Sequence, residues 1–482
     1  MCMFLYRFTL VVLSMVLFGC GGEGTAAPIN TSTTLSVNPA NIQFSSEDHS
    51  AQVDITTNST WSLLVNSDWL TLTPTSGNNN ATISITPCNN SSSQMREVTV
   101  NIKAGTMSKS LTVFQEGKSP DTPVLPADST GMRAIDSVAF SQLLGYGFNI
   151  GNSLEAIGGE IAWGNPLITQ SLMDAIKAAG FNSIRLPVAW SQFSDRDNYI
   201  IKTQWLERIK EVVDYAYNSK LVVVMNMHWD GGWMQPTYAT QDKVNQRIDA
   251  MWTQIEVYFR DYDDHLLFAG TNEVMVEGDY GTPTEEYYTV QNSFNQRFID
   301  TVRATGGRNV YRHLVVQGFN TNIDYTVAFV VMPSDITVNR LMMEVHFYDP
   351  FNFTLNENST LTQWGANAYD ASKIEDWANE AFIDAQFEKM QRNFIEKDIG
   401  VILGEYGAIS RTEDPEHETF RRDWNYYVTD SAMRHKLAPF YWDNGSTNNH
   451  GMGLFNRITG EQVYPEIIEV ITGPVTGPVT GQ

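Results

Sequence analysis

The sequence predicts an α/β protein in which a (β/α)8 TIM barrel follows an N-terminal immunoglobulin-like β-sandwich. Eight apolar runs in the C-terminal two thirds each end in a polar or aromatic residue, and helical patterns fill most gaps between them. Runs without alternation are typical of parallel strands buried on both faces. Ahead of them, short β-type segments are separated by clusters of Asn, Ser, Gly and Pro, as in a sandwich. The chain has 482 residues, whereas a barrel needs about 250, so a second domain is expected.

Composition sets the class of protein and excludes some partners. Hydrophobic residues make up 42% of the chain and charged residues 18%, which suits a folded protein with a large core. The 55 acidic residues outnumber the 31 basic ones and give a formal net charge of −24. Because this field repels phosphate backbones and anionic lipid surfaces, we expect no nucleic-acid partner.

Residues 1–20 have the features of an export signal. A basic residue precedes an apolar run from Phe8 to Phe18 that is too short for a stable membrane span. Leu17-Phe18-Gly19-Cys20 resembles a bacterial lipobox, which implies that Cys20 carries a lipid and becomes the new N-terminus. We therefore expect an exported lipoprotein of the outer membrane, at the cell surface, that touches the membrane only through this anchor. Simple secretion after cleavage nearby is the alternative.

Changes of amino-acid composition along the chain predict the remaining domain boundaries. A small, polar tether leads to the β-rich region, and a linker with three prolines separates that region from the barrel. With Cys2 removed and Cys20 lipidated, Cys88 has no partner for a disulfide or a cysteine-based metal site. The expected domains are the signal peptide 1–20, tether 21–33, β-sandwich 34–117, Pro-rich linker 118–130, barrel 131–472 and low-complexity tail 473–482.

The β-rich region resembles a BACON module. The residues that carry this likeness are Trp61, the stretch from Trp69 to Gly77, and the closing Val113-Phe114-Gln115-Glu116-Gly117. The resemblance implies a small immunoglobulin-like domain of the kind found ahead of bacterial polysaccharide-degrading enzymes. Trp61 and Trp69 could form a sugar platform, but tryptophans in so small a sandwich are more often core residues. We interpret the module as a spacer between the membrane and the barrel.

The elements of the barrel follow in order. Strands are expected at 146–151, 183–188, 221–228, 266–273, 313–319, 340–348, 401–407 and 438–445, and helices at 168–179, 203–220, 284–304, 372–396 and 416–434. Four tryptophans within helical patterns are expected in the core: Trp205, Trp252, Trp377 and Trp424. The segment 349–369 is rich in Asn and Thr, and we interpret it as the wall of a cleft.

Two strand ends carry a carboxylate, Glu273 on strand four and Glu405 on strand seven. Catalytic residues of such barrels lie at the C-terminal ends of strands, and strands four and seven face one another across the mouth. Hydrolysis of a glycosidic bond needs two carboxyl groups, about 5 Å apart where the anomeric configuration is retained. The pair therefore predicts a glycoside hydrolase site.

Several motifs resemble glycoside hydrolase family 5. They are Ile184-Arg185-Leu186-Pro187, Met227-His228-Trp229-Asp230-Gly231-Gly232-Trp233, Glu344-Val345-His346-Phe347-Tyr348, Gly404-Glu405-Tyr406-Gly407 and Tyr441-Trp442-Asp443. Gly151-Asn152-Ser153-Leu154-Glu155-Ala156 with Trp163-Gly164-Asn165-Pro166 is similar to a subgroup rich in endo-β-1,4-glucanases and xyloglucanases, with Ser153 where Thr is common. The likeness covers the whole C-terminal domain in the right strand order.

The resemblance implies that Glu273 is the general acid/base and Glu405 the nucleophile. This division of labour requires a raised pKa for Glu273 and an ionised Glu405. Arg185 and Tyr348 would hold Glu405, and Asn272 would bind the sugar 2-hydroxyl. The other expected substrate-binding residues are His228, His346, the stacking platform Trp442, the cleft tryptophans Trp163, Trp233 and Trp364, and Asn152.

Each of these residue types also has a plainer interpretation. A lone Arg in a strand is usually a paired structural charge, a lone His is usually a core residue, and two His could be metal ligands. No third ligand is spaced for a metal, so we expect neither metal nor cofactor. Glu344 and Glu155 are further carboxylates, but neither occupies the strand-seven position.

The sequence thus predicts a monomeric, retaining endo-β-1,4-glucanase that binds a β-glucan polysaccharide and cleaves its internal bonds by double displacement. Xyloglucan, cellulose-type chains and mixed-linkage β-glucan all fit. A β-mannanase is the nearest alternative, although the GNSLEA and HWDGGW stretches are against it. A surface glycan-binding protein without activity is the other alternative.

Overall fold

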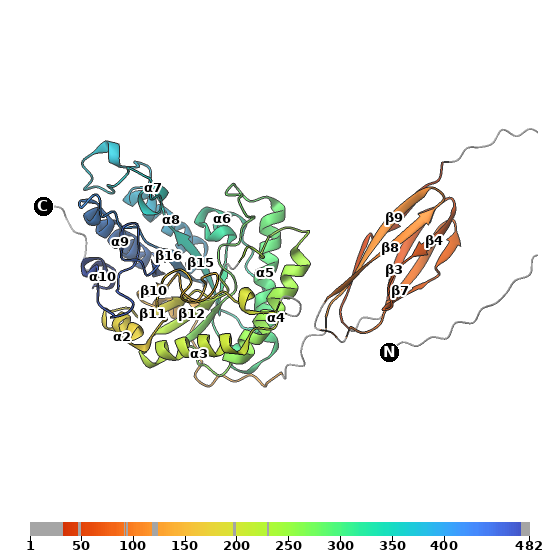
Figure 1. Ribbon diagram of the computed structural model, residues 1–482, viewed down its shortest axis with the longest axis horizontal. Coiled ribbons are helices and arrows are strands. Elements are labelled where there is room, and N and C mark those ends of the chain that lie inside the picture. Colours follow the sequence, from red (N-terminus) through yellow and green to blue (C-terminus); the bar gives the residue numbers. More distant parts are fainter. Residues whose placement is uncertain are drawn as a thin grey trace, which may run out of the picture. The chain divides into compact units, whose positions relative to one another are not determined.

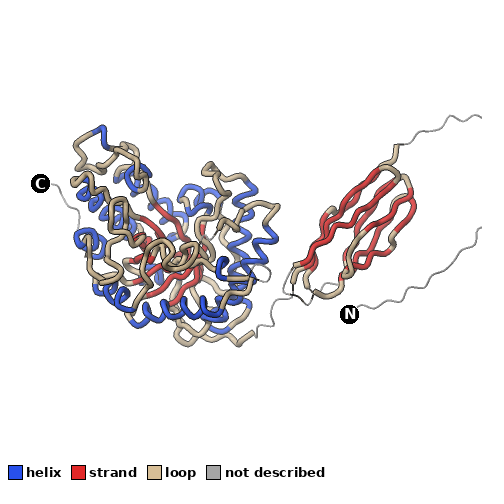
Figure 2. Tube along the Cα trace, viewed as in Figure 1, coloured by secondary structure: helices blue, strands red, loops and turns tan. Residues whose placement is uncertain are grey.

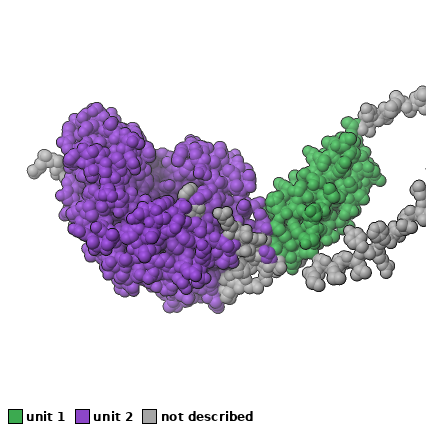
Figure 3. All heavy atoms as spheres, in the orientation of Figure 1, with its two compact units in different colours: residues 1–90, 96–115 green, residues 91–95, 116–482 purple. Residues whose placement is uncertain are grey.

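A computed structural model of the protein describes residues 32–46, 50–90, 92, 95–117, 124–195, 199–228 and 231–473. The predicted signal peptide, Cys20, most of the tether, residues 118–123 of the linker and tail residues 474–482 lie outside them. The described residues fall into two compact units, one ending at Gln115 and the other comprising the rest of the chain, with 91–95 assigned to the second unit (Figure 3). Each unit is described by itself.

The first unit is a β-sandwich of two sheets. One sheet has the order β1-β3-β7-β5 and the other β2-β9-β8-β4-β6. Alternating residues along the strands point into a shared core, as the short β-type segments predict. The strands are β1 (Leu35–Asn38), β2 (Asn41–Phe44), β3 (Ala51–Thr57), β4 (Thr60–Leu64), β5 (Leu70–Thr73), β6 (Ser76–Asn78), β7 (Ala81–Pro87), β8 (Arg96–Ala104) and β9 (Met107–Gln115).

The two tryptophans of this unit differ in their surroundings. Trp61 is a core residue, and its indole N–H donates a hydrogen bond to the carbonyl oxygen of Asn79 at 2.9 Å. Trp69 is half-buried, with the guanidinium of Arg96 lying 4.5 Å over its ring. The expectation of a core role is confirmed for Trp61, whereas Trp69 keeps only part of its surface in the core.

The second unit is a closed barrel of parallel strands surrounded by helices (Figures 1 and 2). Each strand pairs with the next along the chain, and β17 returns to pair with β10. The (β/α)8 prediction is therefore confirmed. The strands are β10 (Gly147–Ile150), β11 (Ser183–Leu186), β12 (Val222–Asn226), β13 (Leu266–Ala269), β14 (Leu314–Gln317), β15 (Leu341–Phe347), β16 (Gly400–Tyr406) and β17 (Leu437–Asp443).

The interior of the barrel changes from apolar to polar along the strands. Side chains such as Val222, Leu267, Met342 and Ile402 fill it near the strand starts. Towards the C-terminal ends, the buried residues become charged or polar, among them Arg185, Gln317 and Glu344. The outer faces of the same strands pack against the helices in a separate, larger core. The polar layer thus rests on a rigid apolar floor.

The helices are capped where their polar boundary residues predict. Side chains of Thr169, Thr284 and Asn379 accept hydrogen bonds from backbone N–H groups in the first turns of α2, α5 and α8. The α-helices are α1 (Ser137–Leu143), α2 (Gln170–Ala178), α3 (Thr203–Asn218), α4 (Gln241–Phe259), α5 (Glu285–Ala304), α6 (Ile323–Phe329), α7 (Phe351–Thr354), α8 (Glu380–Asn393), α9 (His417–Arg434) and α10 (Pro465–Thr472).

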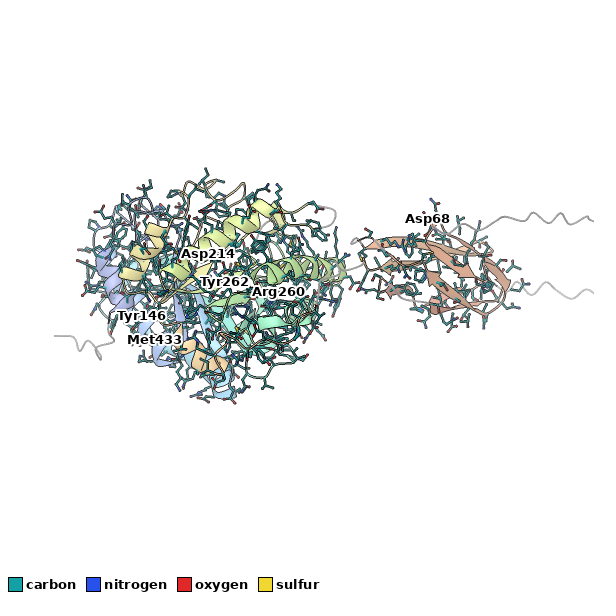
Figure 4. All side chains as sticks on the ribbon, turned by 90° about the horizontal axis from the view of Figure 1, so that it is seen from below. Asp68, Tyr146, Asp214, Arg260, Tyr262 and Met433 are labelled. Carbon is teal, nitrogen blue, oxygen red and sulfur yellow. The ribbon has the colours of Figure 1, made fainter. Side chains whose placement is uncertain are left out.

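Side chains also join neighbouring elements: the hydroxyl of Tyr262 donates to Asp214 of α3, and Figure 4 shows the two side by side.

One predicted helix starts later than expected. After a short 3-10 turn at Ala371–Lys373, residues 374–379 form a loop, because Asn379 is the N-cap of α8. Trp377 therefore lies in a loop and is 52% exposed, so its assignment to the core is wrong. Trp205, Trp252 and Trp424 are buried, as predicted.

Part of the predicted linker lies on the barrel. The backbone N–H of Leu125 donates to the carbonyl oxygen of Thr305 at 2.9 Å, and Asp128 donates to Gly307 at 3.1 Å. Gly306 has a φ of 77°, and a side chain there would collide with the Leu125 carbonyl. This strap fixes the start of the barrel unit. Among the described residues, no helix is both long and apolar enough to cross a membrane.

Candidate active site

A cleft of about 360 Å³ opens at the C-terminal ends of the barrel strands. Its walls come from the loops that follow β10, β12 and β13 and from the end of β17, on the face where such barrels place their chemistry. The residues that line it are Asn152, Glu155, Trp163, Met227, His228, Gly232, Trp233, Met234, Gln235, Asn272, Glu273, Val274, Met275, Glu277, Gly278, Tyr280 and Trp442.

Two carboxylates meet at this mouth. One oxygen of Glu273, one of Glu405 and a ring nitrogen of His346 all lie within 4.8 Å of one another. A β-bulge places Glu405: Val345 of β15 pairs with Leu403, but His346 pairs with Glu405, so Gly404 is the extra residue. Bulges re-aim side chains next to active sites. The sequence prediction that the two acids come together at one rim of the barrel is confirmed.

Arg185 connects the groups around Glu405. Its guanidinium is fully buried and lies 2.8 Å from an oxygen of Glu405, 2.7 Å from Glu344 and 2.6 Å from the side-chain oxygen of Asn272. The hydroxyl of Tyr348 donates to the other oxygen of Glu405 at 3.1 Å. The predicted contacts of Arg185 and Tyr348 with Glu405 are therefore present.

His346 lies between the acids. Its Nδ1 is 2.6 Å from Glu273 and 3.6 Å from Glu405, and its Nε2 is 3.2 Å from Glu344. Burial alone would lower the pKa of this imidazole, but the three carboxylates raise it to about 9. His346 is therefore an imidazolium at neutral pH, and it bridges the pair.

This imidazolium changes the proton balance that the sequence predicts. Burial acts to raise the pKa of Glu273, but the hydrogen bond and charge of His346 outweigh it, and the pKa lies below the usual range. Burial raises the pKa of Glu405, against the opposing effect of His346 and Arg185. The expectation of a raised pKa for Glu273 is thus wrong for this structure. The acidic proton of the group resides on His346, in contact with Glu273.

Aromatic and amide side chains form the cleft walls. Trp163 is 47% exposed, and Trp233 packs under the guanidinium of Arg247 at 4.3 Å. Both line the cleft, as do Asn152, His228 and Trp442. Asn152 has a φ of 56°, and its backbone N–H donates to the carboxylate of Glu155. Glu155 thereby stabilises the turn after β10 that carries Asn152.

Trp364 is not a cleft platform. It is 4% exposed, its indole N–H donates to the carbonyl oxygen of Ala378 at 2.7 Å, and its ring packs near Tyr427. The loop between β15 and α8 folds back on itself and uses Trp364 as a core residue. A sugar cannot stack on a ring face covered by protein, so the sequence prediction is wrong.

Sequence reasoning also missed several residues. Met234, Met275, Glu277 and Tyr280 line the cleft, and Tyr280 is 79% exposed. An aromatic residue in the long polar loop after strand four was the available signal. Glu344 was considered only as a rival carboxylate, yet a charge within the apolar run of β15 indicated a buried partner.

Two groups of side chains have ligand types suited to a metal: Glu273, His346 and Glu405, and Asp263, Asp264 and His265. In the first group, Arg185 contacts Glu405 and the His346 imidazolium already bonds Glu273. In the second group, Arg133 contacts Asp264 at 2.8 Å, and Tyr217 donates to Asp263 at 2.9 Å. A cation would have to displace these contacts. Hydrolysis without a metal remains a prediction.

Comparisons with known families agree with this geometry. The model of cellulase, glycosyl hydrolase family 5, matches residues 145–448. The BACON model, described as a putative N-terminal binding domain, matches residues 52–116. The first match includes all eight barrel strands, and the second includes most strands of the sandwich.

Individual proteins are similar over most of the chain. A xyloglucan-specific endo-beta-1,4-glucanase of Bacteroides ovatus is 39% identical over 444 residues, which is 87% of each chain. Endoglucanase A of Paenibacillus barcinonensis is 39% identical over 368 residues, which is 72% of this chain and 92% of that protein.

Solved structures show the same architecture. A family 5 xyloglucanase of Bacteroides ovatus, in complex with an XXXG heptasaccharide, has a TM-score of 0.69 at 37% identity and covers 91% of this chain and 99% of its own. A broad-specificity endoglucanase of Bacteroides salanitronis has a TM-score of 0.67 at 38% identity, covering 71% and 95%. This protein therefore belongs to glycosyl hydrolase family 5, as a glycoside hydrolase of the retaining endoglucanase type.

Proposed function

We propose that this protein hydrolyses internal β-1,4 bonds of xyloglucan by double displacement, with Glu273 as general acid/base and Glu405 as nucleophile. The observation that carries the proposal is the separation of the two carboxylates, whose nearest oxygens lie within 4.8 Å. Retaining enzymes hold their carboxyl groups about 5 to 5.5 Å apart, whereas inverting enzymes leave about 6.5 to 9.5 Å for a water molecule. This spacing supports direct attack by a carboxylate.

In the first step, Glu405 attacks the anomeric carbon while the glycosidic oxygen takes a proton and leaves. The product is an ester between the sugar and Glu405. In the second step, Glu273 takes a proton from water, the water oxygen attacks the same carbon, and Glu405 is released as a carboxylate. Arg185 and Tyr348 stabilise the charge that returns to Glu405.

The proton for the first step comes from the Glu273–His346 pair. His346 Nδ1 lies 2.6 Å from Glu273, so the proton can pass between them without any movement of heavy atoms. A sugar chain in the cleft excludes water from both groups. Removing water favours the neutral pair, in which Glu273 is protonated and His346 is uncharged. Substrate binding therefore loads the acid.

Two features support xyloglucan as the preferred chain. The similar proteins named above include xyloglucan-specific and xyloglucanase members. The cleft also has apolar walls that contain Met227, Met234 and Met275 beside its aromatic residues. Methionine adapts its shape to irregular apolar partners, which suits a backbone that carries side branches. Unbranched β-glucans are the second candidate, because a broad-specificity endoglucanase is also similar.

The test is the release of reducing ends from matched polysaccharides. Xyloglucan, carboxymethylcellulose, mixed-linkage glucan and mannan would be compared at equal mass concentration with the native protein and with Glu405→Ala. We expect the highest kcat/KM on xyloglucan, no hydrolysis by the variant, and unchanged binding of xyloglucan to the variant in an affinity gel. Equal or higher activity on mannan would refute the substrate assignment.

We also propose that the mature protein is a monomeric lipoprotein of the outer membrane, displayed at the cell surface through Cys20. The lipobox-like Leu17-Phe18-Gly19-Cys20 supports this location. Cys20→Ala should release the protein from the membrane fraction, which immunoblotting of separated fractions would detect. Protein that stays in the membrane fraction would contradict the anchor.

A further inference from the structure

Glu344 is a third carboxylate beneath the catalytic pair. It lies on β15, two residues before His346, and none of its side chain is exposed. An ionised carboxylate without water needs partners of opposite charge and hydrogen-bond donors. Glu344 finds these on β11 across the barrel, on the neighbouring β14 and on its own strand.

One oxygen of Glu344 contacts both Arg185, which holds Glu405, and His346, which holds Glu273. Oε1 lies 2.7 Å from Nε of Arg185 and 3.2 Å from Nε2 of His346. The other oxygen, Oε2, accepts a hydrogen bond from the side-chain amide of Gln317 at 2.7 Å. Glu344 therefore touches the residue that holds Glu405 and the residue that holds Glu273, without touching either acid.

The backbone makes room for this carboxylate. A Cβ atom on Gly404 would lie 2.1 Å from Oε1 of Glu344. Gly404 is also the extra residue of the bulge that pairs His346 with Glu405. The same glycine thus admits Glu344 below the site and aims Glu405 into it, which links the two carboxylates structurally.

Charge balance gives Glu344 a role in the reaction. Without Glu344, the two positive charges of Arg185 and protonated His346 would balance the two negative charges of ionised Glu273 and Glu405. The net charge of the group would then be zero, and nothing would favour binding of a further proton. With Glu344 ionised as well, the group carries one excess negative charge and binds a further proton more tightly. That proton is the one the leaving oxygen needs. The Arg185 contact, the His346 hydrogen bond and the Gln317 hydrogen bond lower the pKa of Glu344 to about 2, although burial acts against ionisation.

We propose that Glu344 is a positioning residue that holds the catalytic proton on His346, from which Glu273 takes it when substrate binds. This inference rests on the proposed function. The Glu344–His346–Glu273 chain has the form of a buried carboxylate that orients and polarises an imidazole in contact with the reacting acid.

The remaining charged and titratable groups around this layer do not replace Glu344. His228, after β12, has a pKa held well below its ordinary value by burial and by the charges of Arg185 and His346, so it is neutral. Burial and the neighbouring Glu405 raise the pKa of Tyr348 well above its ordinary value, so it also stays neutral. Glu344 is thus the carboxylate of the group that supplies charge without taking part in bond making.

The experiment compares native protein and Glu344→Gln, which keeps the shape and removes the charge. Two substrates are used: a xyloglucan oligosaccharide, whose sugar leaving group needs a proton, and a 2,4-dinitrophenyl β-cellotrioside, whose leaving group does not. General acid catalysis contributes about 10²- to 10⁴-fold. We expect a loss of about 10²-fold or more on the oligosaccharide and of less than about tenfold on the aryl glycoside. The alkaline limb of kcat/KM on the oligosaccharide should move to lower pH by about one unit or more.

The matched control is Glu256→Gln. Glu256 is another fully buried carboxyl of the barrel unit, and it accepts hydrogen bonds from Thr305 and Asn309, away from the cleft. Its replacement should leave the alkaline limb where it is. Should Glu344→Gln fail to fold, Gln317→Leu decides the question, because it removes the donor to Oε2 without changing the number of charges. It should move the limb slightly to higher pH, because a carboxylate with one hydrogen-bond donor fewer attracts the His346 proton more strongly.

Equal losses on the two substrates, or an unmoved alkaline limb in both variants, would overturn the role of Glu344. A separate measurement distinguishes failure of this role of Glu344 from failure of the proposed double-displacement function. The native protein and Glu344→Gln would each be treated with a 2-deoxy-2-fluoro cellotriosyl donor that carries the same dinitrophenyl group. Mass spectrometry should find the sugar on Glu405 in both proteins. Native protein that is not labelled on Glu405 would refute the double-displacement function itself.

Discussion

The imidazole of His228 lies parallel to the indole of Trp442, with ring centroids 5.9 Å apart and planes inclined by 16°. The side-chain amide of Asn226 donates to Nδ1 of His228 at 3.0 Å, which leaves the proton of the neutral ring on Nε2. Behind Trp442, a side chain on Gly151 would come within 2.7 Å of the indole ring. The indole is therefore fixed on one side by close packing and presents an aromatic face to the cleft.

Replacing Trp442 should weaken catalysis on every β-glucan. The flat C–H face of a glucose unit at the cleavage point would lose its stacking partner in Trp442→Ala. We expect kcat/KM to fall about 10- to 100-fold, equivalent to ~1.4 to 2.8 kcal/mol. Trp442→Phe keeps an aromatic face and should recover part of the loss. Initial rates on xyloglucan oligosaccharides measure both, and an alanine variant with native kcat/KM would contradict the stacking role.

The stereochemistry of the first product tests the spacing of Glu273 and Glu405. With oxygens within 4.8 Å, direct attack by Glu405 followed by attack of water retains the β configuration. Proton NMR of the earliest product should therefore show the β-anomer, with the α-anomer appearing later by mutarotation. If the α-anomer appears first, one displacement has occurred, and Glu405 is not the nucleophile.

Much of this site could be predicted because barrel strands put their functional groups at one end. Glu273, Glu405, Arg185 and Trp442 each lie at or near the C-terminal end of a strand-like segment, and the closed barrel brings those ends together. Strand order alone then places the two acids across the mouth. No knowledge of loop shape is needed for this inference.

Loop residues could not be assigned in the same way. Trp364 and Trp377 lie 13 positions apart in one long segment, yet the first is buried and the second is exposed. Their environments depend on where the loop folds back and on the Asn379 cap that delays α8, and neither leaves a period in the sequence. The protonation states of Glu273 and His346 could not be predicted from the sequence either, because they depend on His346 lying 2.6 Å from Glu273 rather than on residue types.

Activity should fall at alkaline pH as the imidazolium of His346 is lost. The pKa of His346 is raised from 6.5 to about 9 by Glu405, Glu273 and Glu344, although burial opposes this. A group with a raised pKa gives its full stabilisation below the ordinary value and loses it as the pH rises through the folded value. We expect the alkaline limb of kcat/KM near pH 9. In His346→Gln this limb should disappear, with kcat reduced about 10²-fold or more. A limb that is unchanged in the variant would assign the proton to another group.

The N-terminal module should not shape the active site. The cleft is lined by residues between Asn152 and Trp442, all of them in the barrel unit. A protein lacking residues 21–118 should therefore hydrolyse small soluble xyloglucan oligosaccharides with kcat and KM within about twofold of the full chain, because the differential binding that sets these values stays within the barrel. The catalytically inactive Glu405→Ala form of the same truncated chain supplies the background rate. A large loss would mean that the module completes the site.

The buried carboxyl of Glu256 should make the barrel less stable as the pH rises. Burial raises the pKa of Glu256 from 4.5 to about 7, against the effect of hydrogen bonds from Thr305 and Asn309. Its contribution to folding is most favourable below pH 4.5 and is lost as the pH rises through about 7, by up to ~3 kcal/mol. Glu256→Gln cannot ionise, so its free energy of unfolding relative to the native protein should improve by this order between pH 5 and pH 8. Urea unfolding of the barrel unit at the two pH values measures the change, with the exposed-site variant Glu388→Gln as the control. A difference that does not depend on pH would show that Glu256 is ionised throughout this range.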